Sequence, residues 1–180
     1  MKKRLIQIPV LILVFLGGMI LTSFINNNNN DPMIDSKTLA QVGIIVPDIE
    51  KAVKAYATLF GVETPDIVQA ENPEDNPTTY RGELTDASCL LAFFNLENIQ
   101  LELIQPLGKP STWNDFLEET GGGIHHIAFW IKGMDGQLKK LKMSGIKEVQ
   151  HGGWTGGQYS YVETPEDMGI IIELLENLNE

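Results

Sequence analysis

Four polar side chains lie in short apolar runs that have the character of strands. They are Gln41, Glu102, His126 and Glu173. Successive side chains of a strand point to opposite faces, so in each run the apolar neighbours share one face and the polar residue takes the other. Two carboxylates, one imidazole and one amide oxygen suit Zn²⁺, Ni²⁺, Co²⁺ or Mn²⁺ and leave positions for water or substrate oxygens. The pattern predicts a divalent-metal site, with a polar cavity lining that holds no metal as the alternative.

The same alternation separates the two adjacent histidines. His126 falls on the predicted metal-binding face, together with Ala128 and Trp130. His125 falls on the opposite face, toward a predicted helix, and is expected to be a packed histidine rather than a ligand.

Two similar segments of the chain must position these residues. Each begins with a strand and continues through an amphipathic helix that ends at a glycine, followed by three strand-like runs. The sequence therefore predicts an α+β fold built from two βαβββ modules, residues 38–107 and 123–176. A short helix over 111–119 is expected to link them. A two-fold repeat of this kind predicts one pseudo-symmetric sheet structure, in a single domain over residues 38–176.

The N-terminal segment has a different character. Met1 to Arg4 is basic, and residues 5–25 are almost wholly apolar and long enough to span a bilayer as a helix. We expect residues 1–25 to be a signal anchor, with a cleaved signal peptide as the alternative, and residues 26–37 to be an Asn-rich tether. The domain is then extracytoplasmic, either membrane-anchored or secreted.

The charge of the chain limits its partners. The formal net charge is −11, and three of the 13 basic residues lie within the first four positions. Beyond that N-terminus, 10 basic residues stand against 24 acidic ones. Such a surface repels phosphate backbones, so we expect a small-molecule substrate and no nucleic acid partner.

Several motifs resemble those of the vicinal oxygen chelate superfamily, which includes glyoxalase I, methylmalonyl-CoA epimerase, extradiol dioxygenases and bleomycin-resistance proteins. The most specific are Gln41-Val-Gly-Ile-Ile-Val-Pro-Asp48, Leu101-Glu-Leu-Ile-Gln-Pro-Leu107, Gly123-Ile-His-His-Ile-Ala-Phe129 and Gly169-Ile-Ile-Ile-Glu-Leu174. The second and third look most like methylmalonyl-CoA epimerase. The resemblance implies that the two modules form a cup around the metal.

The resemblance also implies roles for individual residues. The metal-binding positions fall on Glu102, His126 and Glu173, while Gln41 stands where the epimerases usually have His. A set of Gln, Glu, His and Glu is similar to that of animal-type glyoxalase I, and it disfavours the iron site of the dioxygenases, which needs two His. The carboxylate that epimerases use as a base falls on Asp86, with Glu173 as its partner in proton transfer.

Two further residues are candidates for substrate binding. Arg81 could hold a substrate carboxylate at the cavity mouth, or it could be an ordinary surface arginine. Trp154 lies in a Gly-rich segment, residues 152–157, that could close as a flap over an apolar ligand or simply connect two strands.

We therefore expect a divalent-metal-dependent isomerase, epimerase or lyase of the glyoxalase type that acts through an enediolate on a small oxygen-bearing substrate. The alternative is a non-catalytic binding module similar to the bleomycin-resistance proteins. Because coenzyme A and glutathione are cytoplasmic thiols in most bacteria, an exported domain favours another substrate with adjacent oxygens. The resemblance also implies that the protein could form a homodimer.

Overall fold

A computed structural model describes residues 32–108 and 110–179 of the chain. The N-terminal segment 1–25 and most of the tether lie outside the described residues, so both stay predictions. Within the described part of the chain, no helix is both long and apolar enough to cross a membrane.

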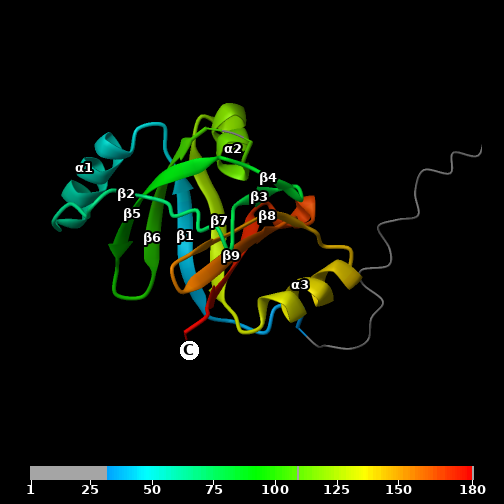
Figure 1. Ribbon diagram of the computed structural model, residues 1–180. Helices are drawn as coiled ribbons and strands as arrows, with labels where there is room; N and C mark the ends of the chain where they lie inside the picture. The colour runs from blue at the N-terminus through cyan, green and yellow to red at the C-terminus, as the bar shows by residue number, and fades with distance from the viewer. Residues whose placement is uncertain (1–31, 109, 180) are drawn as a thin grey trace, which may run out of the picture. The chain divides into compact units, whose positions relative to one another are not determined.

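The described residues form one curled mixed sheet with three α-helices (Figure 1). Helices α1 and α3 lie on the outside of the curl, and α2 lies at one end of it. The elements are β1 (Leu39–Ile45), α1 (Ile49–Phe60), β2 (Val68–Gln69), β3 (Thr79–Tyr80), β4 (Glu83–Leu84), β5 (Ser88–Asn95), β6 (Gln100–Leu107), α2 (Thr112–Thr120), β7 (Gly123–Trp130), α3 (Met134–Met143), β8 (Glu148–Trp154), β9 (Gly157–Val162) and β10 (Ile171–Asn177).

The strand order reveals the two predicted modules. It runs β2-β5-β6-β1-β7-β10-β9-β8-β3-β4. From the central β1–β7 pair outward, each half shows the first strand of a module, then its last strand, and then two strands from between them. The β3–β4 hairpin of the first module follows β8 at the edge of the second half. β1 and β7 are antiparallel, whereas β1–β6 and β7–β10 are parallel pairs. This is the arrangement that a two-fold axis between β1 and β7 would produce.

The helices end and pack as the sequence predicts. Asp48 caps α1 by accepting a hydrogen bond from the Lys51 backbone N–H, and Gly61 ends the helix in the left-handed conformation. The apolar side of α1, including Val53 and Ala57, packs on β5 and β6 on the convex side of the sheet. α3 packs in the same way on the second module, where Met134 and Leu141 meet residues of β10. Both convex faces are therefore ordinary hydrophobic cores, which leaves the concave face for the site.

A short hairpin was not anticipated from the sequence. β3 and β4 are joined by Arg81 and Gly82, both at positive φ, and β3 pairs with β8 of the other module. The preceding loop is also held to that module, because Asn76 Oδ1 lies 3.0 Å from His151 Nε2 and Glu71 accepts two hydrogen bonds from Thr155. The chain of the first module thus crosses to the far edge of the second.

Candidate metal centre

The four central strands carry the predicted ligands. Gln41 lies on β1, Glu102 on β6, His126 on β7 and Glu173 on β10. The register brings them together, because Gly43 of β1 pairs with Glu102 on one side and with His126 on the other. Strand alternation then turns all four side chains to the concave face. Each is at least nine-tenths buried.

Three of these side chains converge on one point. His126 Nε2 lies 3.3 Å from Glu102 Oε2 and 3.1 Å from Glu173 Oε2. None of these three buried atoms has a hydrogen-bond partner of good geometry within the described structure. All three lie within 4.8 Å of one another. Buried polar atoms that converge without partners are costly unless something binds them, and one imidazole with two carboxylates is a donor set that divalent metals prefer. The residues present therefore fit a divalent metal ion.

Gln41 borders the same cavity but is not part of this three-residue cluster. Its Nε2 donates a hydrogen bond of 2.5 Å to Gln100 Oε1. That contact uses the amide nitrogen, so Oε1 is the atom of Gln41 that could act as a ligand. Gln41 can therefore serve as a neutral fourth ligand, or as a polar contact for a substrate.

The charges of the cluster stabilise a protonated imidazole when metal is absent. Burial alone would lower the pKa of His126, but the carboxylates of Glu173 and Glu102 outweigh burial and raise the pKa to about 10. Burial raises the pKa of Glu102, and the neighbouring His126 imidazole opposes this rise. A proton on His126 thus occupies the position that a metal would take.

Gly43 makes room for the His126 ring. A Cβ atom at residue 43 would lie 1.9 Å from His126 Cε1, far inside any van der Waals contact. The ring of His126 also lies 5.0 Å from that of Tyr161. The imidazole therefore lies against Gly43 of β1 and close to an aromatic ring.

The prediction for His125 was wrong about its face. A register shift between Gly43 and Ile44 makes a β-bulge in β7, so that His125 has no partner residue in β1. The bulge turns His125 to the same side as His126, with a distance of 3.0 Å between their Nδ1 atoms. Burial, together with His126, lowers the pKa of His125 to about 3. His125 is a packed, neutral histidine, as expected, but it packs inside the cup.

The concave side encloses a cavity of about 500 Å³. Gln41, Glu102 and Glu173 lie on its wall. The rest of the wall is mostly apolar or aromatic, and includes Cys89, Leu91, Phe93, Ile104, Trp113, Tyr159 and Tyr161, with Trp130 and Trp154 also lining it. Trp113 Nε1 donates to Tyr161 Oη at 3.0 Å, which ties α2 to this wall. A small ligand would therefore meet the carboxylates of Glu102 and Glu173 inside a largely apolar cup.

Three predicted substrate or catalytic residues have different placements. Trp154 lines the cavity and contacts Trp130, with ring centroids 6.4 Å apart. Arg81 is at the turn of the β3–β4 hairpin, 3.9 Å from Asp115, and does not line the cavity. Asp86 is exposed just before β5 and is also absent from the cavity wall. The hairpin explains the absence of Arg81, because it carries residues 79–84 to the outer edge of the sheet.

The sequence analysis did not predict several residues of the cavity wall. Strand alternation within 157–162 could have placed Tyr159 and Tyr161 on one face with Glu173, because β9 pairs with β10. Trp113 and Glu71 gave no such signal, since one comes from the linking helix and the other from a loop. Their places depend on how separate elements meet in space.

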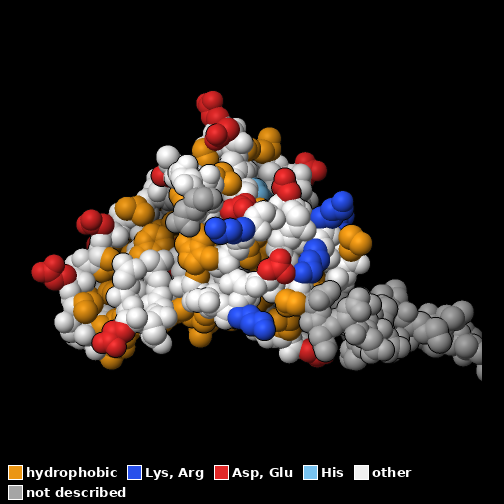
Figure 2. Space-filling view, turned by 90° about the horizontal axis from the view of Figure 1, so that it is seen from below, with side chains coloured by type: hydrophobic (Ala, Val, Ile, Leu, Met, Phe, Trp, Pro, Cys, Tyr) orange, Lys and Arg blue, Asp and Glu red, His pale blue; other side chains and the backbone are white. Residues whose placement is uncertain are grey.

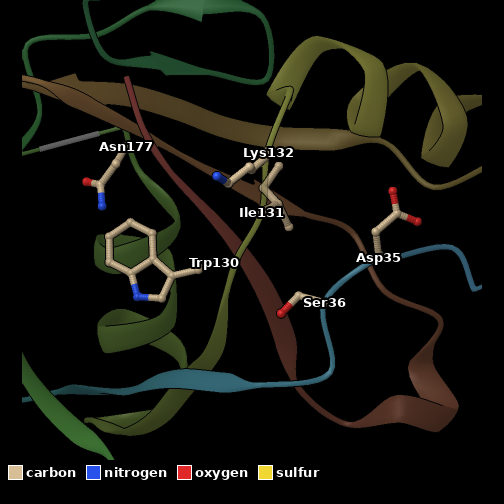
Figure 3. Close-up of a pocket in the computed structure, with 6 residues that line it drawn as sticks. All are labelled: Asp35, Ser36, Trp130, Ile131, Lys132 and Asn177. Carbon is tan, nitrogen blue, oxygen red and sulfur yellow. The ribbon is translucent and has the colours of Figure 1, made fainter. Parts of the chain in front are cut away.

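A second hollow of about 530 Å³ lies beside the cavity (Figure 3). It is found at the end of the sheet where β1 begins and where β7 and β10 end. Trp130 and Asn177 line both spaces, and Lys132, Asp35 and Ser36 line only the outer one. Figure 2 views this end and shows hydrophobic side chains toward the middle of the face, with acidic ones mostly around its outline. Trp130 and Asn177 therefore lie between the candidate metal cavity and a second, partly charged space.

Comparison with known proteins agrees with this geometry. Residues 40–162 match the profile of the Glyoxalase/Bleomycin resistance protein/Dioxygenase superfamily. The chain belongs to this superfamily. The predicted resemblance is thereby confirmed.

Relatives within the superfamily carry epimerase names. The chain is 30% identical over 141 residues to the ethylmalonyl-CoA/methylmalonyl-CoA epimerase of Cereibacter sphaeroides, covering 76% of this chain and 95% of that protein. It is 29% identical over 140 residues to the mitochondrial methylmalonyl-CoA epimerase of Homo sapiens, covering 76% and 72%. These relatives are enzymes, in agreement with the prediction that this chain is one.

Solved structures support the fold. The crystal structure of methylmalonyl-CoA epimerase from Mycobacterium tuberculosis aligns with a TM-score of 0.57 and 23% identity, covering 83% of this chain and 93% of that one. The chain thus shares its fold with that epimerase over 83% of its length.

Proposed function

We propose that this protein is a divalent-metal-dependent isomerase, epimerase or lyase that acts through an enediolate on a small substrate with adjacent oxygens. The observation that carries the proposal is the convergence of His126 Nε2, Glu102 Oε2 and Glu173 Oε2, all buried and all without hydrogen-bond partners of good geometry. The epimerase names of the relatives support the same class of reaction.

His126, Glu102 and Glu173 would hold the metal, with Gln41 as a neutral fourth donor. When bound, the metal supplies Lewis-acid stabilisation of the negative charge that develops on the substrate oxygens. The protein's own residues must then exclude water, orient the substrate and move the proton.

Glu173 is the carboxylate we assign to proton transfer. It reaches the cavity wall from the last strand and is the nearer of the two carboxylates to His126. Asp86 is not in that wall, so the proposal does not route a proton through it. The apolar wall formed by Leu91, Phe93 and Ile104 would keep bulk water from the reacting carbon, which strengthens each electrostatic interaction there.

The substrate need not be confined to the metal cavity. The adjoining hollow shares Trp130 and Asn177 with it, and we infer that a group attached to the reacting part would extend past these two residues toward the hollow. The acyl-CoA compounds named for the relatives are candidates of this kind. An extracytoplasmic location would instead favour a hydroxy-acid, a diol or a carbohydrate derivative.

The test begins with metal content and α-proton exchange. Residues 32–180, purified without added metal, should contain about one equivalent of divalent metal or acquire it from Zn²⁺, Ni²⁺, Co²⁺ or Mn²⁺. The loaded protein in D₂O should exchange the α-proton of at least one member of a small panel that includes methylmalonyl-CoA and dihydroxyacetone. Proton NMR measures that exchange directly.

A matched pair of variants tests Glu173, and the metal content of each variant separates loss of a base from loss of a ligand. E173Q should reduce the exchange by about 100-fold or more, in the range expected for loss of a general base. E163Q changes an exposed carboxylate outside the cavity and should leave exchange unchanged. Equal exchange in E173Q and the wild type would refute the assignment of Glu173.

The second candidate function is a binding module without catalysis. The neutral Gln41 and the absence of Asp86 from the cavity wall favour it. A protein that binds none of the four metals and exchanges no α-proton would support this alternative over an enzyme.

A further inference from the structure

His125 occupies an unusual place for the first of two adjacent strand histidines. Regular alternation would send its side chain to the convex face, where α3 packs. The bulge in β7 removes it from the β1 register and turns it into the cup beside His126. His125 is 1% exposed, so its ring is buried with no route to solvent.

The contact between the two imidazoles is specific. Their Nδ1 atoms are 3.0 Å apart, which requires one nitrogen to donate and the other to accept. His126 directs its Nε2 at Glu102 and Glu173, so that nitrogen is the one available to a metal. An imidazole that binds a metal through Nε2 carries its proton on Nδ1 and donates it to a second partner. His125 Nδ1 is the atom in position to accept that proton.

The surrounding rings hold His125 in this orientation. Phe116 of α2 and Tyr161 of β9 both contact it edge-to-face, with centroid distances of 5.2 Å and 5.3 Å. Tyr161 also contacts His126, so one aromatic side chain sets the relative position of both imidazoles. Rotation of either ring would break these contacts.

We propose that His125 is a positioning residue that accepts a hydrogen bond from His126 Nδ1 and thereby fixes the tautomer in which His126 Nε2 binds the metal. The inference rests on the proposed metal site but adds a residue that is itself no ligand. The bulge then has a function, because it supplies the acceptor from the same strand as the ligand. A neighbouring histidine does here what a carboxylate or a backbone carbonyl does for other metal-binding histidines.

Two variants of nearly equal shape separate hydrogen bonding from packing. H125N keeps an acceptor, since the Asn Oδ1 is attached at the same position of the side chain as the His Nδ1. H125L fills similar space without any acceptor. We expect H125L to lower Zn²⁺ affinity by about 10- to 100-fold in a chelator competition assay. H125N should recover most of that loss.

Two further readouts do not depend on activity. The visible absorption spectrum of the Co²⁺-loaded protein should change in H125L and resemble the wild type in H125N, because it reports ligand geometry. Thermal unfolding of all three metal-free proteins controls for packing. If H125L and H125N lose affinity equally, or if neither loses any, His125 has no role as an acceptor and the inference is wrong.

A test on the wild-type protein does not depend on whether the His125 variants fold. The chain has three histidines, so ¹⁵N-histidine labelling gives few signals, and H151Q assigns the one outside the cup. In the zinc-loaded protein His126 should carry its proton on Nδ1 and His125 should carry its proton on Nε2. A proton on His126 Nε2 would overturn the inference while leaving a metal site intact. A wild type that binds no zinc would overturn both this inference and the proposed function.

Discussion

At the scale of single residues, the site depends on a glycine, Gly43, as well as on the four candidate ligands. Gly43 separates Glu102 from His126 across three neighbouring strands, and its bare backbone is the surface on which the imidazole lies. A motif search for ligands would not select this residue. Its importance is steric, and it follows from the distance between β1 and the ring.

The substitution G43A tests this steric role. The new Cβ would lie 1.9 Å from His126 Cε1, so the ring must move away from the two carboxylates. We expect a loss of stability of about 1–3 kcal/mol, typical of overpacking, together with weaker zinc binding. Chemical denaturation and chelator competition measure the two effects.

Gly136 offers the matched control for that substitution. It lies in α3, and a Cβ there would have no neighbour within 4 Å. G136A should leave zinc binding unchanged and raise helix stability by up to about 1 kcal/mol. If G43A behaved like G136A, the ring of His126 would not be confined as the structure indicates.

Protonation of the cluster predicts the pH dependence of metal binding. In the metal-free protein the pKa of His126 is raised to about 10, so at neutral pH a metal must displace its proton. Apparent zinc affinity should therefore rise with pH between 6 and 8, by about tenfold per unit for one displaced proton. Calorimetry in buffers of different ionisation enthalpy should detect release of that proton. An affinity independent of pH would contradict the protonation state assigned to His126.

At the scale of secondary structure, α2 closes one end of the cup. Ser111 caps it by accepting a hydrogen bond of 3.1 Å from the Asn114 backbone N–H. The helix then presents Trp113 to Tyr161 and Phe116 to His125. The linking helix between the modules is thus part of the site, although its sequence shows only an amphipathic segment.

The cap of α2 can be weakened without touching the cavity. S111A should lower the free energy of unfolding by about 1 kcal/mol, the usual loss for an N-cap side chain. S144A alters a serine at the C-terminal end of α3, whose hydroxyl makes only a 3.4 Å contact, and should change stability by less than about 0.5 kcal/mol. Urea unfolding of the metal-free proteins distinguishes the two, and equal effects would mean that Ser111 does not act as a cap.

At the scale of the whole molecule, two modules of one chain complete one site. Gln41 and Glu102 come from the first module, and His126 and Glu173 from the second. The donor set is therefore complete within a single chain. A homodimer stays a prediction, and it would not be needed to assemble these four residues.

The predicted N-terminal anchor can be tested on the full chain. A C-terminally tagged full-length protein should sediment with membranes and be released by detergent, because residues 5–25 are apolar and long enough to span a bilayer. Residues 32–180 expressed alone should remain in the supernatant. If the domain lies outside the cytoplasm, added protease should digest the tagged domain in cells whose outer envelope has been permeabilised and whose cytoplasmic membrane is intact. Full-length protein in the supernatant, at full size, would contradict the anchor.

The sequence by itself predicted the repeat, the four candidate ligands and the strand faces on which these four residues lie. Alternation is a local property of extended chains, so Glu102 and Glu173 could be assigned to the concave face without knowing any contact. The observed caps of α1 and α2 are local in the same way, because Asp48 and Ser111 each accept a hydrogen bond from a backbone N–H three positions further along the chain.

Only the tertiary structure decided the remaining features, because they depend on pairing between distant segments. The bulge that turns His125 inward is defined by the register of β7 against β1, which neither strand encodes alone. The β3–β4 hairpin crosses to β8, and this places Arg81 away from the cavity. Gly43 acquires its role only when His126 packs against it. Local periodicity predicted the candidate metal ligands, and long-range packing decided which residues contact them.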